Sequence, residues 1–304
     1  NLINTGSLDS QYQGILITTG ATITNLYNNG TIKAQKDGIT FFGDNGSGNK
    51  GEIDNIIIGK QGSIDAQKNA INVDVIGDRQ NTQPVSIGLI NIQEGAKVSG
   101  QEAGIKIASS SNSNNSGSNT VGQIIVTGEV SGKEGGIVNE GTIKASENKS
   151  SSKSRTRRSL EDSQQSEEEK QAAIIVEKTG SITSTSGYGI VNKAMIEGDI
   201  ISKSSSNISL ENQGSATIQG DISNQGLGTL DLMNNASITG NIANTGSGNL
   251  MLNNTGSITK GISLIVDQSN LNMDELNDIN NLVSGVSLNN IKKINTNGSG
   301  EMIL

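Results

Sequence analysis

The chain has 304 residues, of which 32% are hydrophobic and only 2% are aromatic, with 39 glycines and one proline. So few large side chains argue against a thick spherical core, yet Ile, Leu and Val recur too regularly for a disordered chain. The net charge is −8 and no basic stretch is interleaved with aromatic residues, so nucleic acid is not an expected partner. The chain has no histidine and no cysteine, which removes Ser-His-Asp and Cys-His catalysis, imidazole and thiolate metal sites, and disulfides.

One short phrase recurs along the chain: a polar residue, Gly, Ser or Thr, and then an aliphatic residue. Copies of a phrase at intervals of twenty to thirty-odd residues predict one structural unit stacked many times. Each unit would bury a few aliphatic side chains against its two neighbours, which gives a thin, elongated core. The copies occupy residues 4–8, 28–32, 61–64, 139–143, 178–182 and 254–258.

Residues 1–145 are expected to form the N-terminal coils of this solenoid. The aliphatic residue that ends the phrase is followed seven positions later by the next strand start, which predicts strand, turn and strand at one corner. The composition of Ser109 to Asn119 predicts a loop at another corner. The pairs with this interval are Leu8 and Ile15, Ile32 and Ile39, Ile64 and Ile71, Val98 and Ile105, and Val130 and Ile137, while Ile182 and Ile190 stretch it by one.

Residues 146–172 are expected to be a charged, flexible loop. Ile143 should be followed by a strand start near position 150, but the next candidate is Ile174, so roughly 24 residues are inserted into that turn. Blocks of opposite charge without apolar residues cannot offset the entropy cost of ordering. Within the loop, residues 155–159 have the form of a protease site with basic residues. The alternative is that the loop is solvated and is not cleaved biologically. The residues of this possible processing site are Arg155, Arg157, Arg158 and Ser159.

Residues 173–266 are expected to form the most regular coils, of 20–22 residues. The phrase Ile-x-Gly-Asp/Asn-Ile recurs around Gly198, Gly220 and Gly240, and apolar residues alternate within each unit. Alternation indicates strands with one buried face, and a fixed shift stacks identical side chains about 4.8 Å apart. Asp199 and Asp221 share one register in successive coils, which suits either a structural corner or a carboxylate pair for glycoside chemistry or Ca²⁺.

Residues 267–304 are expected to contain a short helix and the final strands. Asn272 and Glu275 have the spacing of a capping box, and Gly285 would end the helix. Strands are expected at 286–288 and 291–294. Such a segment suits a side cover or end cap of the solenoid. The apolar face of the helix would comprise Leu276, Ile279, Leu282 and Val283.

Together these phrases predict an all-β fold, a parallel β-helix with a short helix near the C-terminus. The phrases Asn-x-Gly-Thr-Ile and Ile-x-Gly-Asp/Asn-Ile resemble those of passenger domains of Gram-negative autotransporters, the type V secretion proteins. The resemblance implies a right-handed coil, secretion to the cell surface, and a precursor with a C-terminal translocator barrel. Vacuolating-cytotoxin-like passengers are similar in carrying a hydrophilic, protease-sensitive loop within the β-helix. The chain opens within a phrase, so we expect a processed or excised piece of a longer protein.

The expected function is therefore non-enzymatic binding by a secreted or surface-exposed protein. The expected partner is a host cell-surface receptor or glycan, or another bacterium through self-association, without nucleic acid or a cofactor. No apolar run in the chain approaches membrane-spanning length. The first alternative is a secreted toxin or receptor ligand processed in the segment Arg155 to Ser159. The second is a polysaccharide lyase or hydrolase that uses Asp199 and Asp221.

Overall fold

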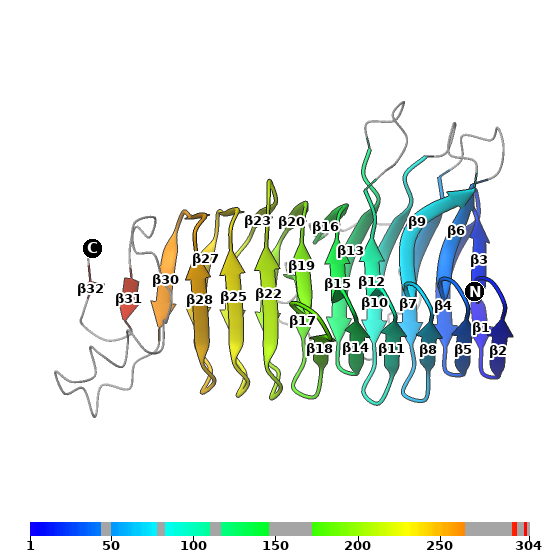
Figure 1. Ribbon diagram of the computed structural model, residues 1–304, viewed down its shortest axis with the longest axis horizontal. Coiled ribbons are helices and arrows are strands. Elements are labelled where there is room, and N and C mark those ends of the chain that lie inside the picture. The colour runs from blue at the N-terminus through cyan, green and yellow to red at the C-terminus, as the bar shows by residue number, and fades with distance from the viewer. Residues whose placement is uncertain are drawn as a thin grey trace, which may run out of the picture.

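The computed structural model describes residues 1–43, 50–77, 83–109, 117–145, 172–264, 294–296 and 301–302. Within these residues the secondary structure consists of strands, which stack in three sheets along a rod (Figure 1). The fold is a parallel β-helix, which confirms the all-β solenoid. The helix expected at 272–285 and the strand expected at 286–288 lie outside the described residues. The strand expected at 291–294 overlaps the observed strand, Ile294–Thr296, only at Ile294.

The first sheet has 17 strands, all parallel to their neighbours except the last one, β32. The strands that form it are β1 (Leu2–Asn4), β4 (Thr22–Asn28), β7 (Glu52–Ile58), β10 (Ser86–Ile92), β13 (Thr120–Val126), β16 (Thr142–Lys144), β17 (Ala172–Val176), β20 (Met195–Glu197), β21 (Asp199–Ser202), β23 (Thr217–Gln219), β24 (Ile222–Asn224), β26 (Ser237–Ile238), β27 (Asn241–Asn244), β29 (Ser257–Ile258), β30 (Gly261–Leu264), β31 (Ile294–Thr296) and β32 (Glu301–Met302).

The second and third sheets have six and nine strands. The second sheet comprises β2 (Ser7–Ser10), β5 (Thr31–Ala34), β8 (Ser63–Ala66), β11 (Lys97–Gly100), β14 (Glu129–Gly132) and β18 (Ser181–Ser184). The third sheet comprises β3 (Ile15–Thr18), β6 (Ile39–Gly43), β9 (Ile71–Gly77), β12 (Ala103–Ile107), β15 (Gly135–Asn139), β19 (Ile190–Asn192), β22 (Ile208–Asn212), β25 (Leu230–Asn234) and β28 (Leu250–Asn254).

The N-terminal coils visit all three sheets in turn, from β1, β2 and β3 to the coil that contains β17, β18 and β19. Beyond β19 the described coils use only the first and third sheets, and Leu210, Leu232 and Leu252 follow one another at shifts of 22 and 20 residues. The predicted stacking of identical residues is therefore present. Shorter coils result because one of the three sides is missing.

The core is a set of aliphatic ladders that run along the rod. One ladder of the first sheet is fully buried, and every second residue of β25 is likewise buried. Burying an Ile side chain stabilises the fold by about 1.5–3 kcal/mol, so a single row supplies a large share of the stability. This ladder comprises Leu26, Ile56, Ile90, Ile124, Ile174, Ile200, Ile222 and Ile242.

A buried polar ladder accompanies the aliphatic ones at the end of the third sheet. The side-chain Nδ2 of each asparagine donates to Oδ1 of the asparagine in the next coil, at 2.8, 2.9, 2.8 and 2.7 Å. Each Nδ2 also donates to a backbone carbonyl at the same corner, so every amide nitrogen of the ladder is hydrogen-bonded, whereas Oδ1 of Asn139 has no donor among the described residues. We call this set the asparagine ladder: Asn139, Asn192, Asn212, Asn234 and Asn254.

The seven-residue interval lies at one corner, where the second sheet passes into the third. Its residue pairs join β2 to β3, β5 to β6, β8 to β9, β11 to β12 and β14 to β15, as predicted. The expectation for Ile143 was wrong, because Ile143 pairs with Val121 and Ile196 in the first sheet. The Gly-Thr turn before Ile32 lies where the first sheet passes into the second, whereas the Gly-Thr turn before Ile143 lies where the third sheet passes into the first.

The insertion consequently lies inside a row of the first sheet. The single strand β13 pairs with both β16 and β17, which flank the insertion. Ile143 and Ile174 are 31 positions apart, whereas the equivalent Ile196 and Ile200 are four apart. The segment is therefore added between two strands that neighbouring coils hold in place.

Candidate functional site

The longer connections of the N-terminal coils share one corner, where the third sheet passes into the first. They join β6 to β7, β9 to β10 and β12 to β13, and the insertion follows β16 in the next coil along. The strand ends that carry these connections lie side by side along one edge of the rod (Figure 1). We call this edge, made by residues 43, 50–52, 77, 83–86, 107–109, 117–120 and 139–145, the loop-bearing edge. Residues 44–49, 78–82, 110–116 and 146–171 lie outside the described residues.

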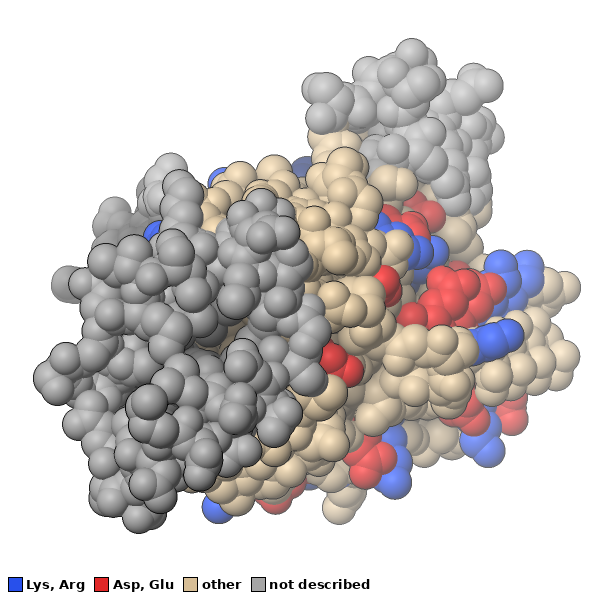
Figure 2. Space-filling view, turned by 60° about the vertical axis from the view of Figure 1, so that its left-hand side comes forward, with Lys and Arg blue, Asp and Glu red and all other residues tan. Residues whose placement is uncertain are grey.

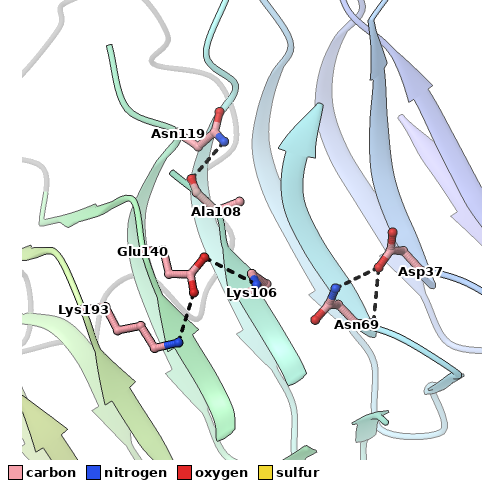
Figure 3. Close-up of polar contacts among 7 residues, drawn as sticks. All are labelled: Asp37, Asn69, Lys106, Ala108, Asn119, Glu140 and Lys193. Atoms are coloured by element: carbon pink, nitrogen blue, oxygen red, sulfur yellow. Dashed lines mark hydrogen bonds and ion pairs between the residues drawn. The ribbon is translucent and has the colours of Figure 1, made fainter. Parts of the chain in front are cut away.

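Asn119 joins the bases of two of these connections. The residue is 2% exposed, and its Oδ1 accepts the backbone N–H of Val85 at 3.0 Å. Its Nδ2 donates to the carbonyl of Ala108 at 3.0 Å (Figure 3). The backbone N–H of Thr142, in the following coil, donates to the carbonyl of Asn119 at 2.9 Å. One buried amide thus holds three chain segments together. Composition predicted the loop but not this role, for which the only sequence signal is an asparagine directly before a strand.

An ion triad lies along the same edge. Glu140 is between Lys106 of β12 and Lys193 of the corner after β19, with Oε2–Nζ and Oε1–Nζ distances of 3.4 and 3.1 Å (Figure 3). Burial by itself acts to raise the pKa of Glu140, but the hydrogen bond from Lys193 and the charges of both lysines outweigh it, so this pKa is lowered. The triad links three coils and places fixed charge beside the connections. Sequence analysis missed it because Glu140 and Lys193 are 53 positions apart.

A buried carboxylate, Asp37, lies at the other end of the third sheet. It is 4% exposed and accepts hydrogen bonds from the backbone N–H of Asn69 at 3.2 Å and from Asn69 Nδ2 at 3.0 Å (Figure 3). It also accepts one from Asn72 Nδ2 at 3.2 Å. Three amide N–H groups thus satisfy the hydrogen-bonding capacity of this buried side chain. Over the described part of the chain, no group of three or more acidic, histidine or cysteine side chains could hold a metal ion. The arrangement fits a structural role at a corner.

Asp199 and Asp221 do occupy successive coils of the first sheet. Oδ1 of Asp199 accepts the backbone N–H of Asp221 at 2.7 Å, and Oδ1 of Asp221 accepts that of Asn241 at 2.8 Å. Nζ of Lys260 is 3.4 Å from the same oxygen of Asp221. Each carboxylate therefore binds the backbone of the next coil, an arrangement that favours a structural corner over a pair facing a shared ligand.

The residues of the possible processing site lie outside the described residues, so the protease interpretation stays a prediction. On the face shown in Figure 2, acidic and basic side chains adjoin, and the described surface shows no single basic patch there. Within the described part of the chain, there is no helix with the length and apolar character needed to cross a membrane.

Comparison of the chain with protein-family models found no matching family. Comparisons with curated proteins and with solved structures likewise found no match.

Proposed function

We propose that this chain is a non-enzymatic binding protein of the autotransporter-passenger type, which contacts host or bacterial surfaces through its loop-bearing edge. The observation that carries the proposal is the alignment of several long connections on one edge of a stiff rod. Binding specificity commonly resides in loops that a rigid scaffold positions. A stacked solenoid offers a long surface on which neighbouring loops act together.

Hydrogen bonds join the bases of two of these connections without any partner. Asn119 joins three chain segments, and the triad around Glu140 links three coils. Ordering loop stems during association costs free energy, so stems that are already held leave more of the contact energy for affinity. The absence of histidine and cysteine from the sequence supports binding over the common forms of acid–base and nucleophilic catalysis.

The recurring phrases and the stacked coils support secretion as a passenger, with a host receptor, a glycan or another copy of the protein as partner. A processed toxin or receptor ligand is the second candidate. It is favoured by one observation: the insertion lies between β16 and β17, which β13 and the following coils hold in register. A cut within the insertion would therefore leave the solenoid joined by its ladders.

Cell-surface binding tests the proposal. Replacing residues 110–116 with a short Gly-Ser linker should weaken binding of the full chain to cells or bacteria about tenfold or more, the equivalent of about 1.4 kcal/mol. Changing Ser205 and Ser206 to Gly, at an exposed turn of another corner, is the matched control and should leave binding unchanged. Equal binding by both variants would contradict the proposal for this loop.

One double variant separates the binding protein from the processed toxin or receptor ligand. Arg157→Ala with Arg158→Ala should leave binding and cell effects unchanged if the chain acts as an adhesin. Loss of a cell effect together with loss of cleavage would favour the processed toxin or ligand instead.

A further inference from the structure

The outer face of the third sheet changes character beyond β19. Two rows of outward residues run along β22, β25 and β28 in the observed register, and neither contains Lys or Arg. One row has Ser209, Asp231 and Met251, and the other has Glu211, Met233 and Asn253, as the strands pair. We call these residues, with Tyr188 and Val191 at their start, the acidic–apolar strip.

The two carboxylates of this strip have no cationic partner among the described residues. Glu211 accepts a hydrogen bond from Gln213 Nε2 at 3.1 Å, and the side-chain carboxylate of Asp231 makes no hydrogen bond or ion pair within the described chain. Elsewhere in the solenoid, acids face lysines across adjacent coils, as Glu129 faces Lys97 at 3.4 Å. Burial raises the pKa of Asp231, so its charge is poorly solvated. A cation supplied from outside would therefore be stabilised there.

Apolar side chains lie beside these carboxylates, since Met251 pairs with Asp231 and Met233 pairs with Glu211. The side chain of Met251 is 43% exposed, although it lies on a strand whose alternate residues are fully buried. Tyr188 packs on a small outer cluster that includes Val138 and Val191. Burial raises the pKa of the Tyr188 hydroxyl, and the negative charges of Asp231 and Glu211 raise this pKa further. Methionine adapts its shape to a partner, and tyrosine combines an apolar ring with a polar tip.

We propose that the acidic–apolar strip is a docking surface for a protein segment that carries Lys or Arg between aliphatic residues. Charge complementarity selects this occupant, because the strip presents two unpaired acids and no base. The aliphatic side chains of the partner would lie against Tyr188, Met233 and Met251. This surface lies on a sheet face and is distinct from the loop-bearing edge, so the proposal stands apart from the proposed function.

The test uses the full chain and a synthetic peptide of alternating Lys and Leu, with affinity measured by titration calorimetry. Glu211→Gln with Asp231→Asn should weaken binding about tenfold, as expected for removing charge partners at an interface. The matched control is Asp9→Asn with Asp65→Asn, which removes the same charge from exposed positions on the second sheet and should change affinity by about twofold or less.

Two further measurements decide the outcome. Met251→Ser should weaken binding about threefold without changing its salt dependence, because it removes apolar contact and no charge. The proposal is overturned if the peptide fails to bind or if both double variants weaken it equally. It is also overturned if the peptide binds only after residues 149–158 are deleted, because the basic part of the chain itself would then occupy the strip.

Discussion

Replacing Asn212, in the middle of the asparagine ladder, with Ala should destabilise the protein far more than replacing the exposed Asn253. In Asn212→Ala, the variant loses the hydrogen bond from Asn192 at 2.9 Å and those to Asn234 Oδ1 at 2.8 Å and to the carbonyl of Ser237 at 3.1 Å. At about 1 kcal/mol for each bond, with a further cost for leaving buried groups unpaired, the free energy of unfolding should fall by about 3–5 kcal/mol.

The assay is urea unfolding followed by circular dichroism, with the midpoint and the slope compared among variants. Asn254→Ala should cost about 1–2 kcal/mol, because Asn254 ends the ladder and loses only one short side-chain bond. Asn253→Ala, at an exposed position of the same strand, should stay within about 0.5 kcal/mol. If Asn212→Ala costs no more than Asn253→Ala, the buried amides do not stabilise the coils as argued.

Three other predictions concern the loop-bearing edge and the coil corners. Asn119→Ala should lower the free energy of unfolding by about 2–3 kcal/mol and speed amide exchange at Val85, and unchanged exchange there would rule out the proposed link. The pKa of Glu140 is lower in the folded state than the unfolded value of 4.5. The contribution of Glu140 to the free energy of unfolding is therefore present above pH 4.5 and is lost as the pH falls through the folded-state pKa. The stability difference from Glu140→Gln, about 1 kcal/mol or less at neutral pH for this partly exposed group, should therefore shrink on acidification, and a difference that grows in acid would contradict the assignment. Gly240→Ala would place its Cβ against the carbonyl of Gly220 and should cost about 1–3 kcal/mol or more, whereas Gly6→Ala meets nothing within 4 Å and should cost far less in the same urea titration.

The repeat predicted the parallel stacking of the strands, the alternation of buried residues and the corner between the second and third sheets. These features depend on local spacing, as between Ile32 and Ile39, or on a constant shift, as between Leu232 and Leu252. The corner of Ile143 was assigned wrongly because Gly followed by Thr favours a turn at either corner and does not specify which sheet comes next.

The polar contacts of the candidate site could not be predicted in the same way. Glu140 meets Lys193 over 53 positions, and Asn69 meets Asp37 over 32, because the coils between them differ in length. Pairing across coils of variable length depends on how many residues each corner holds. The number of residues at a corner depends on connections such as the one before Asn119, and the repeat does not constrain the length of these connections.

The asparagine ladder gives the rod a chemical direction. Nδ2 of each asparagine from Asn139 to Asn234 donates to the following coil, and Oδ1 of Asn139 has no donor among the described residues. In the folded rod each coil therefore offers its amide acceptor to the amide donor of the coil before it, and aligned amides polarise one another favourably. The two ends of the ladder consequently differ: among the described residues, the Asn139 end has an acceptor without a donor, and the Asn254 end has a donor that binds a backbone carbonyl of its own coil.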